Sequence, residues 1–271
     1  MKEIDVIRKT KNPLDKTMMI KAFQSMGIQK SDTIIVHSSL SKIGFVIGGA
    51  QAVVESLLET VSEGTLVMPS HSGDLSDPKD WENPPVPSEW FEQLYEHMPA
   101  FSEDLTPTRS MGKIADCFLR KSGRYRSNHP QVSFTAYGKD AKIITEGHAL
   151  TPGLGMDSPL GKLYNLTSKI VLIGVSFDHC TAFHLSEAMT NLMPFTTTGS
   201  PIYRDGKREW VRYNEIEYDD SDFLLYGNTL LEEGIGQKYS FGLTDVTILP
   251  FKESVDRVKD LMLKKRFDKV V

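Results

Sequence analysis

Residues 33–68 read TIIVHSSLSKIGFVIGGAQAVVESLLETVSEGTLVM, and this segment sets the fold class. Its first four residues are a β-branched apolar run, which predicts a buried strand. After a loop with three glycines, apolar residues recur at helical spacing from Ala50 to Val61, and Gly64 follows the predicted helix. Residues 65–68 predict a second buried strand. A strand–loop–helix–strand unit indicates that the two strands pair in parallel.

The rest of the chain alternates in the same way. Further predicted elements are helices at 13–28, 88–97 and 181–192, a strand at 170–175, a hairpin at 200–226 that turns at Asp205-Gly206, and a C-terminal amphipathic helix on Val255, Val258, Leu261 and Met262. We therefore predict an α/β protein, a three-layer α/β/α fold with a mixed, largely parallel sheet whose mixed character comes from the hairpin. We expect one domain, 1–271, with an acidic insertion at about 70–107 and a β-hairpin region at about 200–226.

Composition excludes several classes of protein. The chain has 271 residues, of which 39% are apolar and 25% charged, so it is not a disordered chain. Its net charge of −5 argues against a general nucleic-acid binder. No apolar run approaches the roughly 20 residues that span a bilayer, and the N-terminal residues lack a secretory signal pattern. We expect a cytoplasmic protein with no membrane partner.

The cysteines and histidines do not follow a metal-binding pattern. Cys117 and Cys180 form no CxxC pair, and no HxxxH or HxH pair occurs, so we predict no metal site. In a reducing cytosol the two cysteines are expected to be free thiols. These spacings make a metal-dependent hydrolase a weak alternative, and the absence of a GxSxG motif makes a serine hydrolase weaker still.

Charge is segregated along the chain. The segment from 109 to 126 holds six cations and one acidic residue, which suits an anionic ligand such as a phosphate. The acidic insertion and the hairpin region carry many carboxylates, which suit a polycationic ligand. The loop at 37–49 is rich in hydroxyl groups and glycine, and it follows a strand and precedes a helix, where backbone N–H groups bind anions. It is neither a P-loop nor a dinucleotide fingerprint.

A candidate general base lies on the helix at 181–192. His184 and Glu187 are one turn apart and share a helix face with Thr181 and Asn191, whereas Leu185, Met189 and Leu192 fall on the face expected to pack into the core. A carboxylate beside a histidine stabilises the imidazolium that forms on proton transfer. The helix follows a buried strand, at the edge where α/β folds place their sites.

Taken together, the motifs of this sequence resemble those of the aminoglycoside 3-N-acetyltransferase family of antibiotic acetyltransferases. The matching pieces run in order over roughly residues 15–250: HSSL at 37–40 with IG at 43–44 and GG at 48–49, GTLVMP at 64–69, TPT at 106–108 with MG at 111–112, RSNHP at 126–130 with Ser133, Gly155 with SPL at 158–160, LIGV at 172–175, and Thr181 with His184 and Glu187. The sequence departs from the family pattern at Phe101-Ser102-Glu103 and at Asp178-His179-Cys180.

The resemblance implies a fold distinct from the GNAT acetyltransferases and a reaction in which acetyl-CoA, as cosubstrate, acetylates an amine of an aminoglycoside or similar polycationic amino-sugar. It implies that His184 and Glu187 are catalytic. The residues that we expect to bind coenzyme A are His37, Ser38, Ser39, Ser41, Lys42, Gly44, Phe45, Val46, Thr108, Arg109, Ser110, Met111 and Gly112. The residues that we expect to bind the cationic substrate are His71, Asp74, Glu82 and Asp178.

Two alternatives stay open at this point. A protein that senses coenzyme A, or binds it silently without turnover, would keep the charged segments and need no catalytic pair. Within the enzyme hypothesis, Cys180 could carry the acetyl group in place of a direct attack, because His179 and His184 are close in sequence. The sequence also leaves homo-oligomerisation open.

Overall fold

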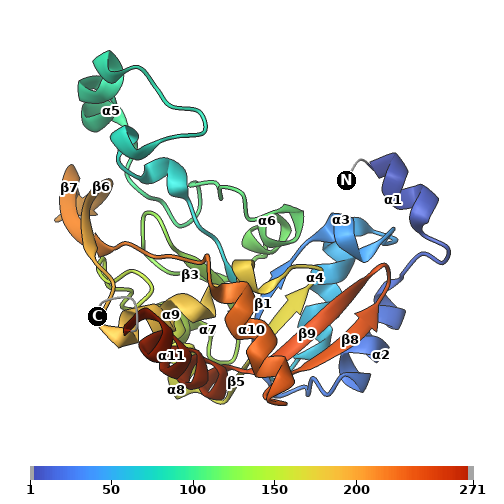
Figure 1. Cartoon of the computed structure of the whole chain (residues 1–271). Helices are drawn as coiled ribbons and strands as arrows, with labels where there is room; N and C mark the ends of the chain where they lie inside the picture. The colour runs from blue at the N-terminus through green and yellow to red at the C-terminus, as the bar shows by residue number, and fades with distance from the viewer. Residues whose placement is uncertain (1–2, 268–271) are drawn as a thin grey trace.

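The computed structural model describes residues 3–267, which form a central sheet with helices on both faces (Figure 1). The sheet has seven strands in the order β3-β4-β2-β1-β5-β9-β8. Their bounds are β1 Thr33–Ser38, β2 Thr65–Pro69, β3 Tyr125–Arg126, β4 Phe134–Gly138, β5 Ser168–Ile173, β8 Gln237–Phe241 and β9 Thr244–Pro250. Thus the α/β class and the mixed sheet are confirmed.

Parallel pairing is limited to the centre of the sheet, so the sheet is mixed but not largely parallel as predicted. β1 pairs in parallel with β2, as predicted, and also with β5. The pairings of β4 with β2 and of β9 with β5 are antiparallel, as are the outer pairings. The antiparallel part of the main sheet therefore comes from β3, β4, β8 and β9. It does not come from the hairpin, contrary to the sequence-based reason for expecting a mixed sheet.

Alternate residues of the central strands point to opposite faces, as β geometry requires. Ile34 and Val36 pack toward one helical layer, and Ile35 packs toward the other. The first layer comprises α2 Lys16–Ser25, α4 Gly49–Thr60 and α6 Lys113–Leu119. The second comprises α7 Ala141–Thr145, α8 Pro159–Asn165, α9 Ala182–Thr190, α10 Phe223–Glu232 and α11 Phe251–Phe267. These two cores make the three predicted layers.

The helix predicted from the strongest apolar periodicity is α4, and its bounds agree with the prediction to within one residue. The predicted first helix is shorter than expected, because Asp15 caps α2 and Met26 ends it. Several helices were not predicted: α1 Glu3–Lys9, α3 Leu40–Ile43, α6, α7, α8 and α10. α10 begins at Phe223, inside the region 200–226 that was predicted to be a hairpin. No helix within residues 3–267 is both long and apolar enough to cross a membrane.

The acidic insertion, residues 70–107, projects from the sheet beside a separate hairpin (Figure 1). It contains three 3₁₀ helices, Gly73–Leu75, Pro78–Asp80 and Ser88–Trp90, and α5 Phe91–His97. The hairpin pairs β6 Phe195–Arg204 with β7 Lys207–Ile216 as its own two-stranded sheet. Asp205 and Gly206 have positive φ angles of 51° and 74°, as a type I′ turn requires, so the predicted turn is confirmed.

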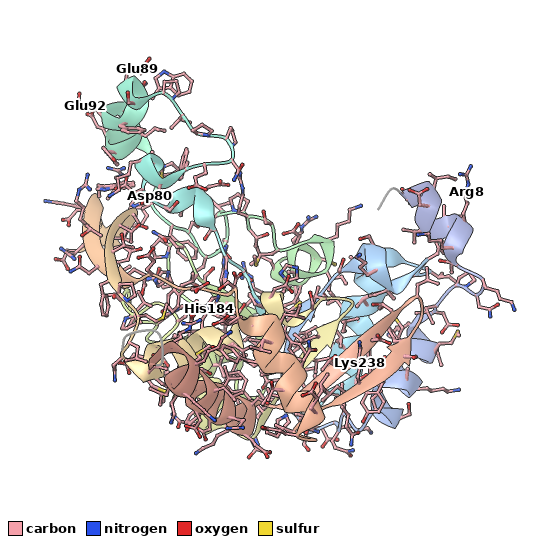
Figure 2. All side chains as sticks on the ribbon, in the orientation of Figure 1. Arg8, Asp80, Glu89, Glu92, His184 and Lys238 are labelled. Carbon is pink, nitrogen blue, oxygen red and sulfur yellow. The ribbon has the colours of Figure 1, made fainter. Side chains whose placement is uncertain are left out.

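Asp77 joins the insertion to the hairpin. Its side chain is fully buried, and it accepts a hydrogen bond of 2.6 Å from the Tyr95 hydroxyl and lies 3.3 Å from Arg212 of β7. The rings of Tyr95 and Trp210 pack with centroids 4.7 Å apart. Charge and aromatic packing therefore hold the two projections together. Figure 2 shows the labelled acids Asp80, Glu89 and Glu92 on the insertion, with His184 below them near the sheet.

Candidate active site

His184 and Glu187 form a hydrogen-bonded pair on α9. Their separation of three residues places both side chains on one helix face, and His184 Nδ1 lies 2.6 Å from Glu187 Oε2. A carboxylate only accepts hydrogen bonds, so Nδ1 carries the hydrogen and Nε2 is the basic nitrogen of the neutral ring. The His184 side chain is 18% exposed, whereas Glu187 is fully buried. The arrangement presents one basic nitrogen to a ligand and holds its partner inside the fold.

The ring of His184 is fixed from two further sides. Tyr218 packs against it edge-on with centroids 5.0 Å apart, and Phe223 of α10 lies at 4.8 Å. Glu187 in turn accepts a hydrogen bond from the Asp219 backbone N–H at 3.1 Å. Sequence analysis placed Glu187 on a face apart from the core. The structure buries it, because the segment after the hairpin and α11 cover that side of α9.

β5 leads to α9 through a sharp turn and the 3₁₀ helix η4 Phe177–His179. Gly174 has a φ of +67°, and a Cβ at this position would lie 2.8 Å from the side chain of Lys42. Only glycine therefore lets the chain turn so close to the loop after β1. This close approach brings the His37–Val46 loop, η4 and His184 to the same edge of the sheet.

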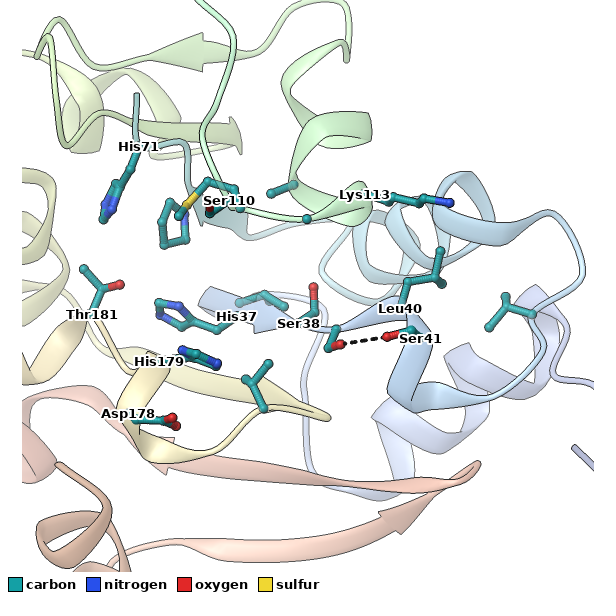
Figure 3. A pocket seen from close by; sticks show the side chains of 18 of the residues that line it. His37, Ser38, Leu40, Ser41, His71, Ser110, Lys113, Asp178, His179 and Thr181 are labelled. Atoms are coloured by element: carbon teal, nitrogen blue, oxygen red, sulfur yellow. Dashed lines mark hydrogen bonds between the residues drawn. The ribbon is translucent and has the colours of Figure 1, made fainter. Parts of the chain in front are cut away.

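These elements line a cavity of about 740 Å³. Of the residues predicted to bind coenzyme A, ten line it: His37, Ser38, Ser39, Ser41, Gly44, Phe45, Val46, Ser110, Met111 and Gly112. Of those predicted to bind the cationic substrate, His71 and Asp178 line it, as does His184. Figure 3 shows Lys113 and Ser41 at one end, and Asp178, His179 and Thr181 at the other. Lys113 thus lies at one end of the cavity and Asp178 at the other.

Other predicted residues lie away from the cavity. Arg109 and Asp74, predicted for opposite ligands, pair with each other at 2.5 Å. Thr108 hydrogen-bonds Asp116 of α6. Lys42 and Glu82 are exposed, and neither lines the cavity. The geometry therefore gives these five side chains no direct contact with a ligand in the cavity.

The basic segment 109–126 does not act as one anion-binding surface, which corrects the sequence-based interpretation. Arg126 is 3% exposed, and this burial lowers the pKa of its guanidinium to about 10. The guanidinium donates to the Ser70 carbonyl at 2.9 Å and to the Thr106 carbonyl at 2.6 Å. Arg124 pairs with Asp104 at 2.7 Å, and Lys121 lies over the Tyr137 ring. Of the six cations, Lys113 lines the cavity. Three of the six, Arg109, Arg124 and Arg126, contact residues of the acidic insertion.

Several cavity residues were missed by sequence analysis. They are Glu3 and Val6 of α1, Pro69, Val175 and Asp220. α1 lies there because Thr10, just after it, accepts a hydrogen bond of 2.8 Å from the Phe45 backbone N–H. No local pattern in the first ten residues signals such a contact. Asp220 belongs to the acidic residues after the hairpin, and its position depends on how that segment crosses α9.

Two buried histidines also face this region. Burial lowers the pKa of His37 and of His71 to about 3, so both rings are neutral at physiological pH. The Nε2 atom of each is buried, and no hydrogen-bond partner for it lies within residues 3–267. Both residues line the cavity, where a ligand could supply that partner. Neutral imidazoles at these positions avoid repelling a protonated His184.

Both cysteines are free, as predicted. Cys180 is completely buried between η4 and α9, and burial raises the pKa of its thiol to about 12. Acyl transfer through a cysteine requires the thiolate. At neutral pH only a negligible fraction of such a thiol ionises, so the structure disfavours an acetylated Cys180.

Comparison with known proteins is consistent with this site. A family model described as aminoglycoside 3-N-acetyltransferase matches residues 35–263. The SPbeta prophage-derived aminoglycoside N(3')-acetyltransferase-like protein YokD of Bacillus subtilis is 42% identical, over 93% of each chain. Aminoglycoside N(3)-acetyltransferase VII of Streptomyces paromomycinus is 27% identical, over 94% of each chain.

Solved structures are also similar. The crystal structure of the YokD protein from Bacillus subtilis superposes with a TM-score of 0.95 at 39% identity, covering 97% of this chain and 98% of that one. The crystal structure of aminoglycoside acetyltransferase AAC(3)-Xa gives a TM-score of 0.88 at 27% identity, covering 96% of each chain. The likeness therefore extends over the whole fold, including the segments that form the cavity.

Proposed function

Because the chain belongs to the aminoglycoside 3-N-acetyltransferase family, a family of enzymes, we propose that it transfers the acetyl group of acetyl-CoA to an amine of an aminoglycoside or similar polycationic amino-sugar. The observation that carries the proposal is the His184–Glu187 pair at the wall of a cavity with charged side chains of opposite sign. A silent coenzyme A binder would not need a basic nitrogen held by a buried carboxylate.

The cavity residues fit the proposed cosubstrate. The loop after β1 supplies the hydroxyl groups of Ser38, Ser39 and Ser41, and Gly49 lies at the N-terminus of α4. Hydroxyls, helix N-terminal N–H groups and a lysine are the donors that bind phosphates. Lys113 therefore marks the end for the anionic nucleotide. When bound, acetyl-CoA supplies an activated thioester.

The opposite end fits a cationic acceptor. Asp178 and Asp220 line the cavity on the side of η4 and α9, and the acidic insertion lies above. Carboxylates attract and orient polyamines. An acceptor held between these carboxylates and His184 would bring one amine next to the basic nitrogen.

His184 then performs the proton transfer. Only a free amine attacks a thioester, so His184 Nε2 accepts a proton as the acceptor nitrogen bonds to the acetyl carbon. The C–S bond breaks, and coenzyme A leaves as a thiol after its sulfur takes up the proton from the His184 imidazolium, which returns the histidine to its neutral form. Glu187 stabilises the imidazolium through its 2.6 Å hydrogen bond with Nδ1. The buried, protonated state of Cys180 favours this direct attack over a covalent route.

The test is thiol release from acetyl-CoA by the purified protein, with and without a panel of aminoglycosides and natural polyamines. We expect release that depends on the acceptor and saturates with its concentration. Coenzyme A binding without release for any acceptor would favour a silent binding protein. The absence of coenzyme A binding would refute the proposed reaction.

A further inference from the structure

Glu187 places a negative charge inside the fold, and such a charge needs compensation. Its two oxygens have separate partners. Oε2 faces His184, whereas Oε1 accepts hydrogen bonds from the Asp219 backbone N–H at 3.1 Å and from Arg266 Nη1 at 2.8 Å. A single guanidinium from the last turn of α11 therefore contacts the oxygen that His184 does not use.

Arg266 is itself held firmly. Its side chain is 14% exposed, its Nη2 donates to the Asp219 carbonyl at 3.0 Å, and its Nε lies 3.7 Å from Asp222 Oδ2. Burial alone would lower the pKa of Arg266, but the hydrogen bond with Glu187 and the charges of Glu187 and Asp219 raise it. The guanidinium stays charged, and its planar fork holds Glu187 Oε1 through Nη1 and the Asp219 carbonyl through Nη2.

We propose that Arg266 is a positioning residue of this enzyme, which acts through Glu187 to orient His184 and to set the proton affinity of the pair. The inference rests on the proposed role of His184 as the base. It extends the catalytic machinery to residue 266, beyond the segment 35–263 that the family model matches. The contacts of Arg266 and the Asp219 backbone N–H with Oε1 would hold the Glu187 side chain in the rotamer that directs Oε2 toward His184 Nδ1. Neither contact comes from α9 itself.

The charge of Arg266 has a predictable effect on titration. A proton added to the His184–Glu187 pair is repelled by the nearby guanidinium, so removing the guanidinium favours the protonated pair, whichever partner holds the proton. The titratable groups near His184 are Tyr218, His37 and His71, and His179 lies near His37. Glu215 lies near Tyr218, and Asp219 and Asp222 lie near Arg266. Each of them remains when Arg266 is replaced.

The experiment compares Arg266→Gln and Arg266→Lys with Lys264→Gln, which removes a cation from an exposed position on the same turn. Acceptor-dependent thiol release is measured from pH 5.5 to 9. For Arg266→Gln we expect kcat to fall by about 10-fold or more, as when other partners that orient a functional histidine are lost. The acid limb of the kcat/KM profile should move up by about 1 pH unit. Arg266→Lys should restore the position of that limb, and Lys264→Gln should match the unmodified protein.

A second measurement separates positioning from a merely structural role. In a Glu187→Gln background the buried charge is gone, so Arg266→Gln should cost little further activity and the double variant should stay folded in a thermal scan. Equal losses in both backgrounds, or an unshifted pH profile for Arg266→Gln, would overturn the inference while leaving the His184 assignment intact. Undiminished turnover of a His184→Gln variant would instead refute the role of His184 as the base, on which the inference rests, and the absence of coenzyme A binding by the unmodified protein would refute the proposed function itself.

Discussion

His184 owes its chemistry to contacts at atomic range. Its Nδ1 is committed to Glu187, two aromatic rings fix its plane, and its Nε2 is the nitrogen left for substrate. A helix that carried the same two residues without these surroundings would supply neither the tautomer nor the orientation. The role of the histidine is therefore a property of its local packing as much as of its identity.

The His184→Gln variant tests that role directly. We expect kcat to fall by about 10²–10⁴-fold, because general-base catalysis typically contributes that factor. Coenzyme A binding, measured by calorimetry, should stay within a few-fold, since the serine loop is unchanged. His97→Gln, at an exposed position of α5, is the control. Near-normal turnover by the His184 variant would refute the assignment.

Cys180 provides a second residue-level test, which separates the two routes of acyl transfer. Cys180→Ala keeps a small apolar side chain in a fully buried position. We expect kcat to change by less than about 10-fold, because the buried thiol is not the nucleophile. Mass spectrometry of the unmodified protein incubated with acetyl-CoA alone should show no acetylated Cys180. Loss of turnover in a folded Cys180→Ala protein would support the covalent route.

At the scale of elements, the packing of α10 on η4 determines where α9, the helix that carries His184, begins. Phe177 of η4 stacks on Phe183 of α9, with centroids 6.0 Å apart and planes at 11°. On its other side Phe177 contacts Gly227 so closely that a Cβ there would lie 1.9 Å from Cγ of the ring. Any side chain at position 227 would push η4 and α9, and with them Asp178 and His184.

We therefore expect Gly227→Ala to be destabilising. Overpacking of this kind costs about 1–3 kcal/mol in free energy of unfolding, even though alanine has the higher helix propensity. Asn228→Ala, at the neighbouring exposed position, is the matched control and should be neutral or slightly stabilising. Urea unfolding of the two variants measures the difference. Equal free energies of unfolding for the Gly227→Ala and Asn228→Ala variants would contradict this prediction, because they would show that η4 moves away from the added methyl group without loss of stability.

Elements also differ in how far local sequence predicts them. β1, β2 and α4 were predicted because their apolar periodicity and glycine boundaries lie within the segments themselves. β4 and β9 were not, because they are defined by antiparallel partners far along the chain. The same reason explains the basic segment. The carbonyls that hold Arg126 belong to Ser70 and Thr106, so its local charge pattern could not reveal its burial.

At the scale of the whole molecule, the site combines both ends of the described chain. Glu3 of α1 lines the cavity, and Arg266 of α11 contacts Glu187, while β1 and β5 carry the loops between them. Sequence motifs predicted the central part, since His184 and Glu187 lie within one turn of α9 and most of the residues predicted to bind coenzyme A lie in the single segment 37–46. The contributions of α1 and α11 depend on the closed fold, which no local motif encodes.

Buried neutral histidines make the stability of the whole fold sensitive to acid. His129 is 1% exposed; its Nδ1 accepts from two backbone N–H groups, its Nε2 contacts the Leu150 carbonyl, and burial lowers its pKa to about 4. Burial also lowers the pKa of His148, whose ring packs against that of His129, and the pKa of His37, in each case to about 3. In acid, each of these three histidines must therefore release its proton when the chain folds.

The sign of the effect follows from linkage. Between pH 6.5 and about 4 the unfolded chain binds protons on these histidines that the folded chain does not, so the free energy of unfolding falls as the pH is lowered. Each such group contributes up to about 1.4 kcal/mol per pH unit, and above pH 6.5 the contribution levels off. Urea unfolding at pH 7.5, 6.0 and 5.0 measures the slope, in a range where most carboxylates stay ionised. His129→Asn should reduce the slope, whereas His97→Asn should not. A free energy of unfolding that does not change between pH 6.5 and 5.0 would contradict the prediction, because it would mean that the folded protein binds protons on these histidines as readily as the unfolded chain does.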